Sequence, residues 1–115
     1  MIKNFIDVKK QALENSHDGI GEYELFEIWN SKDFKSNIDF IDRVVIPPQS
    51  TVGYHKHGNN EEIYIVLEGR GEMTLNGKTV QVKKGDMILN QPWGEHGLVN
   101  NSDDVIDLLV VQVSL

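Results

Sequence analysis

The dipeptide Asn76-Gly77 lies between two short runs of alternating side chains, 72–75 and 78–82. A two-residue type I′ turn needs positive φ at both central positions, which asparagine and glycine adopt most easily. The sequence therefore predicts a tight antiparallel β-hairpin at this point. This is the local feature that most restricts the fold.

Short runs of the same kind fill most of the chain, and turn residues end each of them. Pro47-Pro48 ends one run because proline cannot donate to a β-ladder, and Gly69-Arg-Gly71 ends another. The predicted strands are 24–29, 40–46, 63–67, 72–75, 78–82, 87–89 and 105–113. The long apolar run of the last one predicts burial on both faces. Turns at intervals of roughly 8 to 12 residues are typical of an all-β sandwich or barrel.

The N-terminal third is less regular. One short helix is predicted around Asp7 to Asn15, and Gly19 and Gly21 then mark a loop. A length of 115 residues suits one domain with its own core. We therefore expect a single domain over 1–115, with a barrel core at about 40–113 and an N-terminal strand or helix extension at 1–39.

The composition restricts the partners and the chemistry. The chain has 18 acidic and 11 basic residues, a formal charge of -7, and only doublets such as Lys83-Lys84 as basic clusters, so we expect neither nucleic acid nor membrane as a partner. It has no cysteine, so any metal site must use nitrogen and oxygen ligands. Neither a signal peptide nor a membrane span is apparent, and we expect a cytoplasmic protein.

Three of the four histidines lie in two places where strands begin or end. His55 and His57 are two residues apart, so on a strand they share a face, with Cα atoms about 6.6 to 7 Å apart. Two ring nitrogens could then reach one ion at about 2.0 to 2.2 Å each. Glu61 and Glu62 follow after a turn, and His96 comes after the predicted hairpin. The His-x-His pair alone is more typical of surface or half-buried residues.

The combined spacing resembles that of a known family. His55-x-His57-x4-Glu62-x6-Gly69 resembles the first cupin motif, and Gly85, His96 and Asn100 are spaced as in the second. The two motifs together span residues 48–100. The chain thus resembles a small single-domain, metal-binding cupin, and this resemblance implies a double-stranded β-helix, or jelly-roll, barrel.

The chain departs once from each of the two cupin motifs. Gln49 replaces the glycine that usually opens the first motif. In the second motif, Gln91 replaces the usual first proline and Gly94 lies one position late. Both changes fall in predicted turns, so they concern loop shape and the residues near the pocket entrance rather than the ligands.

The resemblance implies that His55, His57, Glu62 and His96 hold one divalent transition-metal ion. Glu62 is preferred to Glu61 because of its six-residue spacing to the motif glycine, and Glu61 would face the other way in an alternating strand. Nitrogen and oxygen ligands suit Mn, Fe, Co, Ni, Cu or Zn. Four protein ligands around an octahedral ion leave two positions for a substrate.

Two residues are candidates for catalysis. Tyr64 shares strand parity with Glu62, so its side chain points inward, either to place a hydroxyl near a substrate or to pack in the core. Glu95 precedes His96 and could act as a general acid or base, and the alternative is an exposed loop glutamate.

Four further residues have weaker assignments. Asn100 caps a turn or orients the loop of His96, and Trp93 is a candidate for the rim of the pocket. Arg43 either faces inward, where it could pair with an anionic substrate, or lies outside the barrel. His17 lies in a loop, and nothing in the sequence connects it to the other histidines.

The resemblance permits several functions. The first hypothesis is a metal-dependent isomerase, decarboxylase, cyclase or dioxygenase that acts on a small oxygen-rich molecule such as a keto acid, sugar or phenolic compound. The alternative is a non-catalytic module that binds or senses a small ligand, and an interaction protein with a vestigial site is a third. The resemblance also implies a homodimer, in which open sheet edges pair and the N-terminal segment with Phe5 and Trp29 contributes.

Overall fold

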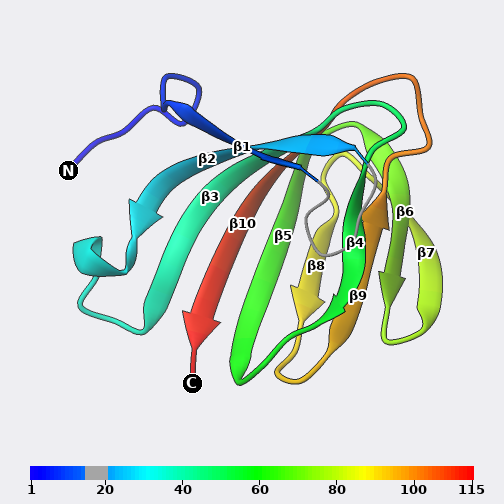
Figure 1. Ribbon diagram of the computed structural model, residues 1–115. Helices are drawn as coiled ribbons and strands as arrows, with labels where there is room; N and C mark the ends of the chain where they lie inside the picture. The colour runs from blue at the N-terminus through cyan, green and yellow to red at the C-terminus, as the bar shows by residue number, and fades with distance from the viewer. Residues whose placement is uncertain (15–20) are drawn as a thin grey trace.

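Two antiparallel β-sheets face one another in the computed structural model, which describes residues 1–14 and 21–115, with the backbone alone at 10–14 (Figure 1). The larger sheet has six strands in the spatial order β1 (Lys10–Glu14), β2 (Glu22–Asn30), β3 (Ile38–Ile46), β10 (Ile106–Ser114), β5 (Asn60–Glu68) and β8 (Met87–Asn90). The smaller sheet has four strands in the order β4 (Thr51–Lys56), β9 (Glu95–Val99), β6 (Arg70–Leu75) and β7 (Lys78–Lys83). The all-β jelly-roll prediction is confirmed.

All the strands predicted from alternation are present, with shifted ends, as β2, β3, β5, β6, β7, β8 and β10. Alternation works here because one face of each sheet packs on the core and the other faces outward. β10 lies between β3 and β5. Its inward residues, such as Leu108 and Val110, are buried, and its outward residues, such as Leu109 and Val111, are half-buried. The expected burial on both faces is therefore complete on the inner face only.

The core is shared by the two sheets. Completely buried side chains come from both of them: Ile46, Ile106 and Leu108 from the larger sheet, and Met73 and Leu98 from the smaller one. Because the buried side chains of both sheets form one cluster, the sheets are held together by burial of their facing apolar sides.

The predicted helix around Asp7 to Asn15 is wrong over the described residues. Residues 10–14 form β1, which pairs antiparallel with β2. A helix of this length is marginal without packing, whereas the open edge of β2 offers backbone hydrogen-bonding partners along the whole segment. Asn15, and likewise His17 and Gly19, lie outside the described residues.

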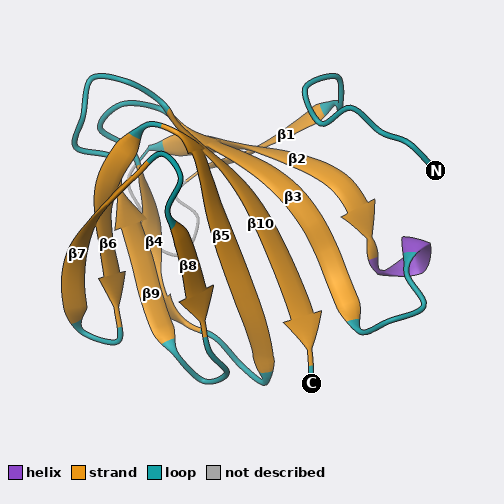
Figure 2. Cartoon of the chain, turned by 180° about the vertical axis from the view of Figure 1, so that it is seen from behind, coloured by secondary structure: helices purple, strands orange, loops and turns teal. Residues whose placement is uncertain are grey.

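Helical structure in the described part of the chain is confined to one 3₁₀ turn at Ser31–Asp33 (Figure 2). The Asn30 side chain accepts a hydrogen bond from Lys32 N, and the Asp33 carboxylate accepts one from Asn30 N. No helix among the described residues is long and apolar enough to cross a bilayer.

Arg43 lies on the outer face of the larger sheet. Its Nε and Nη2 donate to the two carboxylate oxygens of Asp107 at 2.9 and 2.8 Å. The guanidinium also lies 5.2 Å from the ring of Phe26 and 5.5 Å from that of Phe5. The outward alternative for Arg43 is therefore the correct one. Phe5 of the N-terminal segment contacts its own chain here, and the homodimer stays a prediction.

The predicted hairpin connects β6 and β7. Asn76 and Gly77 have φ of 49° and 81°, as a type I′ turn requires. The Asn76 side chain also accepts a hydrogen bond from Glu95 N at 2.9 Å. The turn residue therefore holds the start of β9 as well as reversing the chain.

We predict that Asn76→Ala lowers the free energy of unfolding by about 1–2 kcal/mol, because alanine is strained at positive φ and cannot accept the Glu95 hydrogen bond. Asn76→Gly is the control, since glycine adopts this φ freely and lacks only the hydrogen bond. Urea unfolding should therefore show a smaller loss for glycine. Equal losses would mean that backbone strain contributes nothing at this turn.

Candidate metal centre

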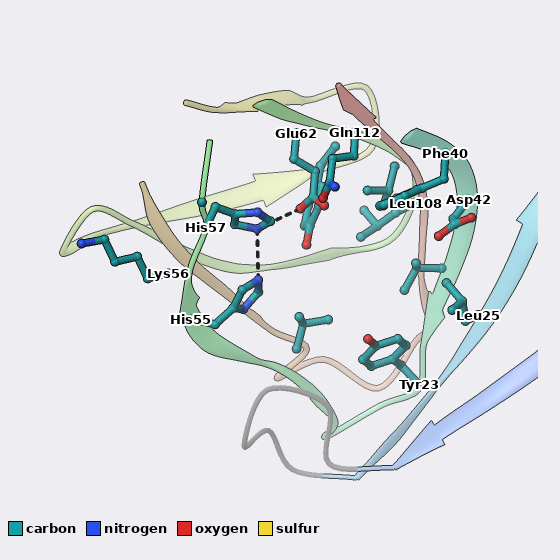
Figure 3. A pocket seen from close by; sticks show the side chains of 15 residues that line it. Tyr23, Leu25, Phe40, Asp42, His55, Lys56, His57, Glu62, Leu108 and Gln112 are labelled. Carbon is teal, nitrogen blue, oxygen red and sulfur yellow. Dashed lines mark hydrogen bonds and ion pairs between the residues drawn. The ribbon is translucent and has the colours of Figure 1, made fainter. Parts of the chain in front are cut away.

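Cross-strand pairing brings the predicted ligands together. His55 on β4 is the direct partner of His96 on β9 in the smaller sheet. Glu62 on β5 is the direct partner of Asn90 on β8 in the larger sheet. The two pairs meet where the inner faces of the sheets oppose each other, and Figure 3 shows His55, His57 and Glu62 around one end of a cavity.

The three imidazoles converge through their Nε2 atoms. These atoms are 3.1 Å apart for His55 and His57, 2.7 Å for His57 and His96, and 3.1 Å for His55 and His96. Oε1 of Glu62 lies 3.3 Å from Nε2 of His57 and 3.5 Å from Nε2 of His96. His96 is 1% exposed and Glu62 is 6% exposed. Segments far apart in the sequence therefore place four potential ligand atoms in one small buried volume.

Each of these rings directs its other nitrogen, Nδ1, at an oxygen atom. In the order His55, His57 and His96, the acceptors are Gly53 O at 2.7 Å, Asn60 Oδ1 at 3.0 Å and Asn90 Oδ1 at 2.6 Å. A carbonyl or amide oxygen can only accept, so Nδ1 carries the hydrogen in the neutral form of all three rings, and Nε2 then carries a lone pair. Asn90 is fixed in this orientation because its Nδ2 donates to the Glu62 carbonyl at 3.2 Å.

This donor set fits a divalent cation. Three lone pairs at such distances repel each other unless a positive charge lies between them. Adjacent ligands of an octahedral ion at about 2.1 Å would lie about 3.0 Å apart, which is √2 times the bond length. The observed separations of 2.7 to 3.1 Å match three adjacent corners. His55, His57 and His96 therefore form a group that could hold a metal ion.

The electrostatics of the site centre on the Glu62 carboxylate. Its hydrogen bond raises the pKa of His57, against the opposing effect of burial. Burial, with the Glu62 charge in addition, raises the pKa of Tyr64 well above its ordinary value. Tyr64 therefore stays protonated as a potential hydrogen-bond donor. Its ring centroid is 5.2 Å from that of His96, and it lines the same cavity.

A glycine next to His96 makes the convergence possible. A Cβ at Gly97 would lie 2.9 Å from Tyr54 Cα and 3.0 Å from Tyr54 N on β4. Any larger residue would force β9 away from β4 and separate His96 from His55. Only glycine allows this close approach of the two backbones.

Two residues in the turns that depart from the cupin motifs lie at strained positions. Gln49 and Trp93 have φ of 62° and 63°, where residues other than glycine are disfavoured by about 1–2 kcal/mol. Trp93 is exposed, and its N–H donates to Gly58 O at 2.9 Å. His57 N donates to the carbonyl oxygen of Gly94, the residue after Trp93, at 2.8 Å. This turn therefore holds the backbone on both sides of the His57 imidazole, and Trp93 lies against Gly58, a residue of the cavity wall.

Two other predicted residues lie away from the converged group. Asn100 is completely buried, and its Nδ2 donates to Ile46 O at 2.9 Å and Asp104 O at 2.7 Å, which is the structural role expected for it. Glu95 is exposed and accepts a hydrogen bond from the Tyr54 hydroxyl at 3.1 Å. Because Glu95 and His96 are neighbours on β9, their side chains take opposite faces. We assign no chemical step to Glu95.

The cavity contains a carboxyl group that sequence reasoning missed. The cavity has a volume of about 400 Å³, and Asp42 lies in its wall on β3, only 8% exposed. Oδ1 of Asp42 is buried without a hydrogen-bond partner among the described residues. Burial first, then the charges of Glu27 and Glu62, raise the pKa of Asp42 from 3.8 to about 7. The sequence did contain a signal for Asp42: it alternates with Phe40 and Val44 in an apolar run, so its side chain shares their inward face.

The comparisons with known proteins agree with this geometry. A family model of the cupin domain matches residues 42–112. The chain belongs to the cupin family. An oxalate-binding protein of Thermotoga maritima is 29% identical over 115 residues, which cover 100% of this cupin and 95% of the relative. An uncharacterized protein of Methanocaldococcus jannaschii is 38% identical over 74 residues, which cover 64% of this cupin and 59% of that protein.

Solved structures are similar over the whole chain. The crystal structure of a predicted oxalate decarboxylase from Thermotoga maritima matches this cupin with a TM-score of 0.97 at 29% identity, over 100% of both chains. A polyketide cyclase from Streptomyces resistomycificus matches with a TM-score of 0.81 at 23% identity, over 98% of this cupin and 80% of that chain. The second likeness concerns the fold alone.

We predict that Asp42→Asn stabilises the metal-free protein more at pH 8 than at pH 5, by about 2–3 kcal/mol. Because the folded pKa is near 7 and the unfolded value is 3.8, folded wild-type protein keeps a proton that the unfolded chain releases, and its stability falls as pH rises through this window. Asparagine does not titrate. Urea unfolding at both pH values measures the difference.

The exposed Asp103 provides the matched control, since Asp103→Asn removes the same formal charge from the surface. This variant should show no such difference between pH 5 and pH 8. A stabilisation by Asp42→Asn that is equal at both pH values would contradict a raised pKa.

Proposed function

We propose that this cupin binds one divalent transition-metal ion through His55, His57, His96 and Glu62, and through that ion a small carboxylate of which oxalate is the first candidate. The observation that carries the proposal is the convergence of three Nε2 lone pairs at 2.7 to 3.1 Å, with every Nδ1 engaged by an oxygen. Such outer hydrogen bonds are typical of metal-binding histidines.

The charge of the site favours an anionic ligand. Three neutral imidazoles and one carboxylate around a divalent ion leave a net charge near +1. The ion supplies Lewis-acid binding of ligand oxygens, and a six-coordinate ion has two positions beyond these four protein ligands. Two carboxylate oxygens of one small acid suit two such positions.

The protein residues supply orientation. Asn60, Asn90 and Gly53 O hold the rings, so the ligand atoms need little rearrangement when a cation enters. The buried Tyr64 hydroxyl stays protonated and can donate to a ligand oxygen. The apolar side chains in the cavity wall, such as Val52 and Leu108, lower the local dielectric and so strengthen both interactions.

The relatives support oxalate as the first ligand to test. The Thermotoga maritima protein that aligns with the whole of this cupin is named an oxalate-binding protein, and the crystal structure with a TM-score of 0.97 is named a predicted oxalate decarboxylase. A binding protein leaves oxalate intact, whereas a decarboxylase converts hydrogen oxalate to formate and carbon dioxide. Incubation with oxalate and assay of formate therefore separate a binding module from an enzyme.

We predict about one divalent ion per chain in protein purified without chelator, and calorimetric oxalate binding that requires this ion. His57→Ala should lose the ion, because two imidazoles and one carboxylate bind a cation more weakly. Glu62→Gln should weaken metal binding, and Glu61→Gln is its matched control, since Glu61 is the outward neighbour on β5. Folded wild-type protein that binds no divalent ion at micromolar concentration would refute the proposal.

We predict a separate effect for the residue that orients His96. Asn90→Ala removes the acceptor of the His96 Nδ1 hydrogen bond and should lower metal affinity 10–100-fold, as loss of outer-shell partners commonly does. The stoichiometry at saturating metal should stay the same. Asn90→Asp keeps an acceptor oxygen and should bind metal more tightly than Asn90→Ala; the reverse order would mean that this hydrogen bond does not orient the ring.

A further inference from the structure

The cavity is much larger than the proposed metal ligands and oxalate require. Its volume of about 400 Å³ lies in the range of about 300–1,000 Å³ that is typical of sites for larger organic ligands. A two-carbon acid on the metal would fill one end only. Figure 3 shows the remainder of the cavity extending toward Leu108, Phe40, Leu25 and Tyr23, and these are mainly apolar residues.

Asp42 breaks this apolar wall. In Figure 3 it lies across the cavity from His55 and His57. In the larger sheet Asp42 pairs with Val110, and Val110 pairs with Tyr64. Two strand spacings, about 10 Å, therefore separate the backbones of Asp42 and Tyr64. The carboxyl is at the end of the cavity remote from the imidazoles.

A buried carboxyl oxygen without a partner needs an explanation. Oδ1 of Asp42 has no hydrogen-bond partner among the described residues, and such a group destabilises a folded protein. A ligand that reaches this end of the cavity could supply the missing hydrogen bond. A buried carboxyl at position 42 is thus less destabilising in the ligand-bound protein than in the empty one.

The charges around Asp42 restrict the ligand group that can lie there. The charges of Glu27 and Glu62 both raise the pKa of Asp42, so these two carboxylates contribute a negative potential at this position. The same potential disfavours a second carboxylate of a ligand. A hydroxyl is uncharged and can donate or accept, so it matches Asp42 in either protonation state.

We propose that Asp42 is a specificity-determining residue that hydrogen-bonds an uncharged hydroxyl at the far end of the ligand. The ligand class is a small 2-oxo or related acid with an apolar body and a terminal hydroxyl. Its acid end binds the ion and its body lies along Leu108 and Phe40. This inference rests on the proposed metal-bound carboxylate and adds the part of the ligand that oxalate lacks.

The test uses two probes that differ by one hydroxyl, phenylpyruvate and 4-hydroxyphenylpyruvate, with oxalate as a probe of the metal end alone. Each is titrated calorimetrically into the full chain loaded with Co(II). We expect wild-type protein to bind 4-hydroxyphenylpyruvate at least tenfold more tightly than phenylpyruvate, since a site built to hydrogen-bond a hydroxyl rejects the analogue without it.

Asp42→Val removes the carboxyl with little change of volume and should reduce this preference to less than threefold. Asp42→Asn keeps a donor and an acceptor and should retain more of the preference than Asp42→Val. Asp103→Asn, a surface substitution, should leave the preference unchanged. The affinity for oxalate should change much less than this preference in all three variants.

The inference is overturned if wild-type protein does not distinguish the two aromatic probes, or if it binds neither while binding oxalate. It is also overturned if folded Asp42→Val keeps the full preference of the wild type. Asp42→Ala serves as the second apolar variant should Asp42→Val not fold, and full retention of the preference by Asp42→Ala overturns the inference equally. The failure of the proposed function is distinct, because it would appear as folded protein that binds neither Co(II) nor oxalate.

Discussion

The arrangement of the site depends on where three ring hydrogens go. Because each Nδ1–H is donated to an oxygen, three Nε2 lone pairs face one another. The bond from His96 to Asn90 also joins the two sheets, since His96 is on β9 and Asn90 is on β8. The same contact that orients a ligand nitrogen therefore also fixes the distance between the layers. A cation at the convergence point would relieve the repulsion that this orientation creates.

Much of the fold could be predicted from the sequence because its signals are local. The Asn76-Gly77 turn needs only its own backbone conformation, and alternation along β5 places Glu62 and Tyr64 on one face whatever strands lie beside it. β1 has no such signal. Its conformation follows from pairing with the edge of β2. The segment taken alone predicts a short helix instead.

The parts of the site that sequence reasoning missed depend on which strands are neighbours. Asn90 becomes the partner of His96 because β8 pairs with β5 and faces β9 across the core. Asp42 becomes a cavity residue because β3 is joined to β5 through β10. Asp42 lies before both cupin motifs in the chain, and Asn90, although six residues before His96, is not one of the motif residues. The four metal-ligand candidates, in contrast, follow from the spacing of the cupin motifs.

The two ends of the cavity are coupled through one charge. The Glu62 carboxylate that would attract a cation also helps to raise the pKa of Asp42. A cation held by Glu62 opposes that negative potential, so it favours ionisation of Asp42. By linkage, the affinity for the metal must then be higher when Asp42 is ionised than when it is neutral. The unpartnered carboxyl and the imidazole group thus act as parts of one electrostatic unit, although a mainly apolar wall separates them.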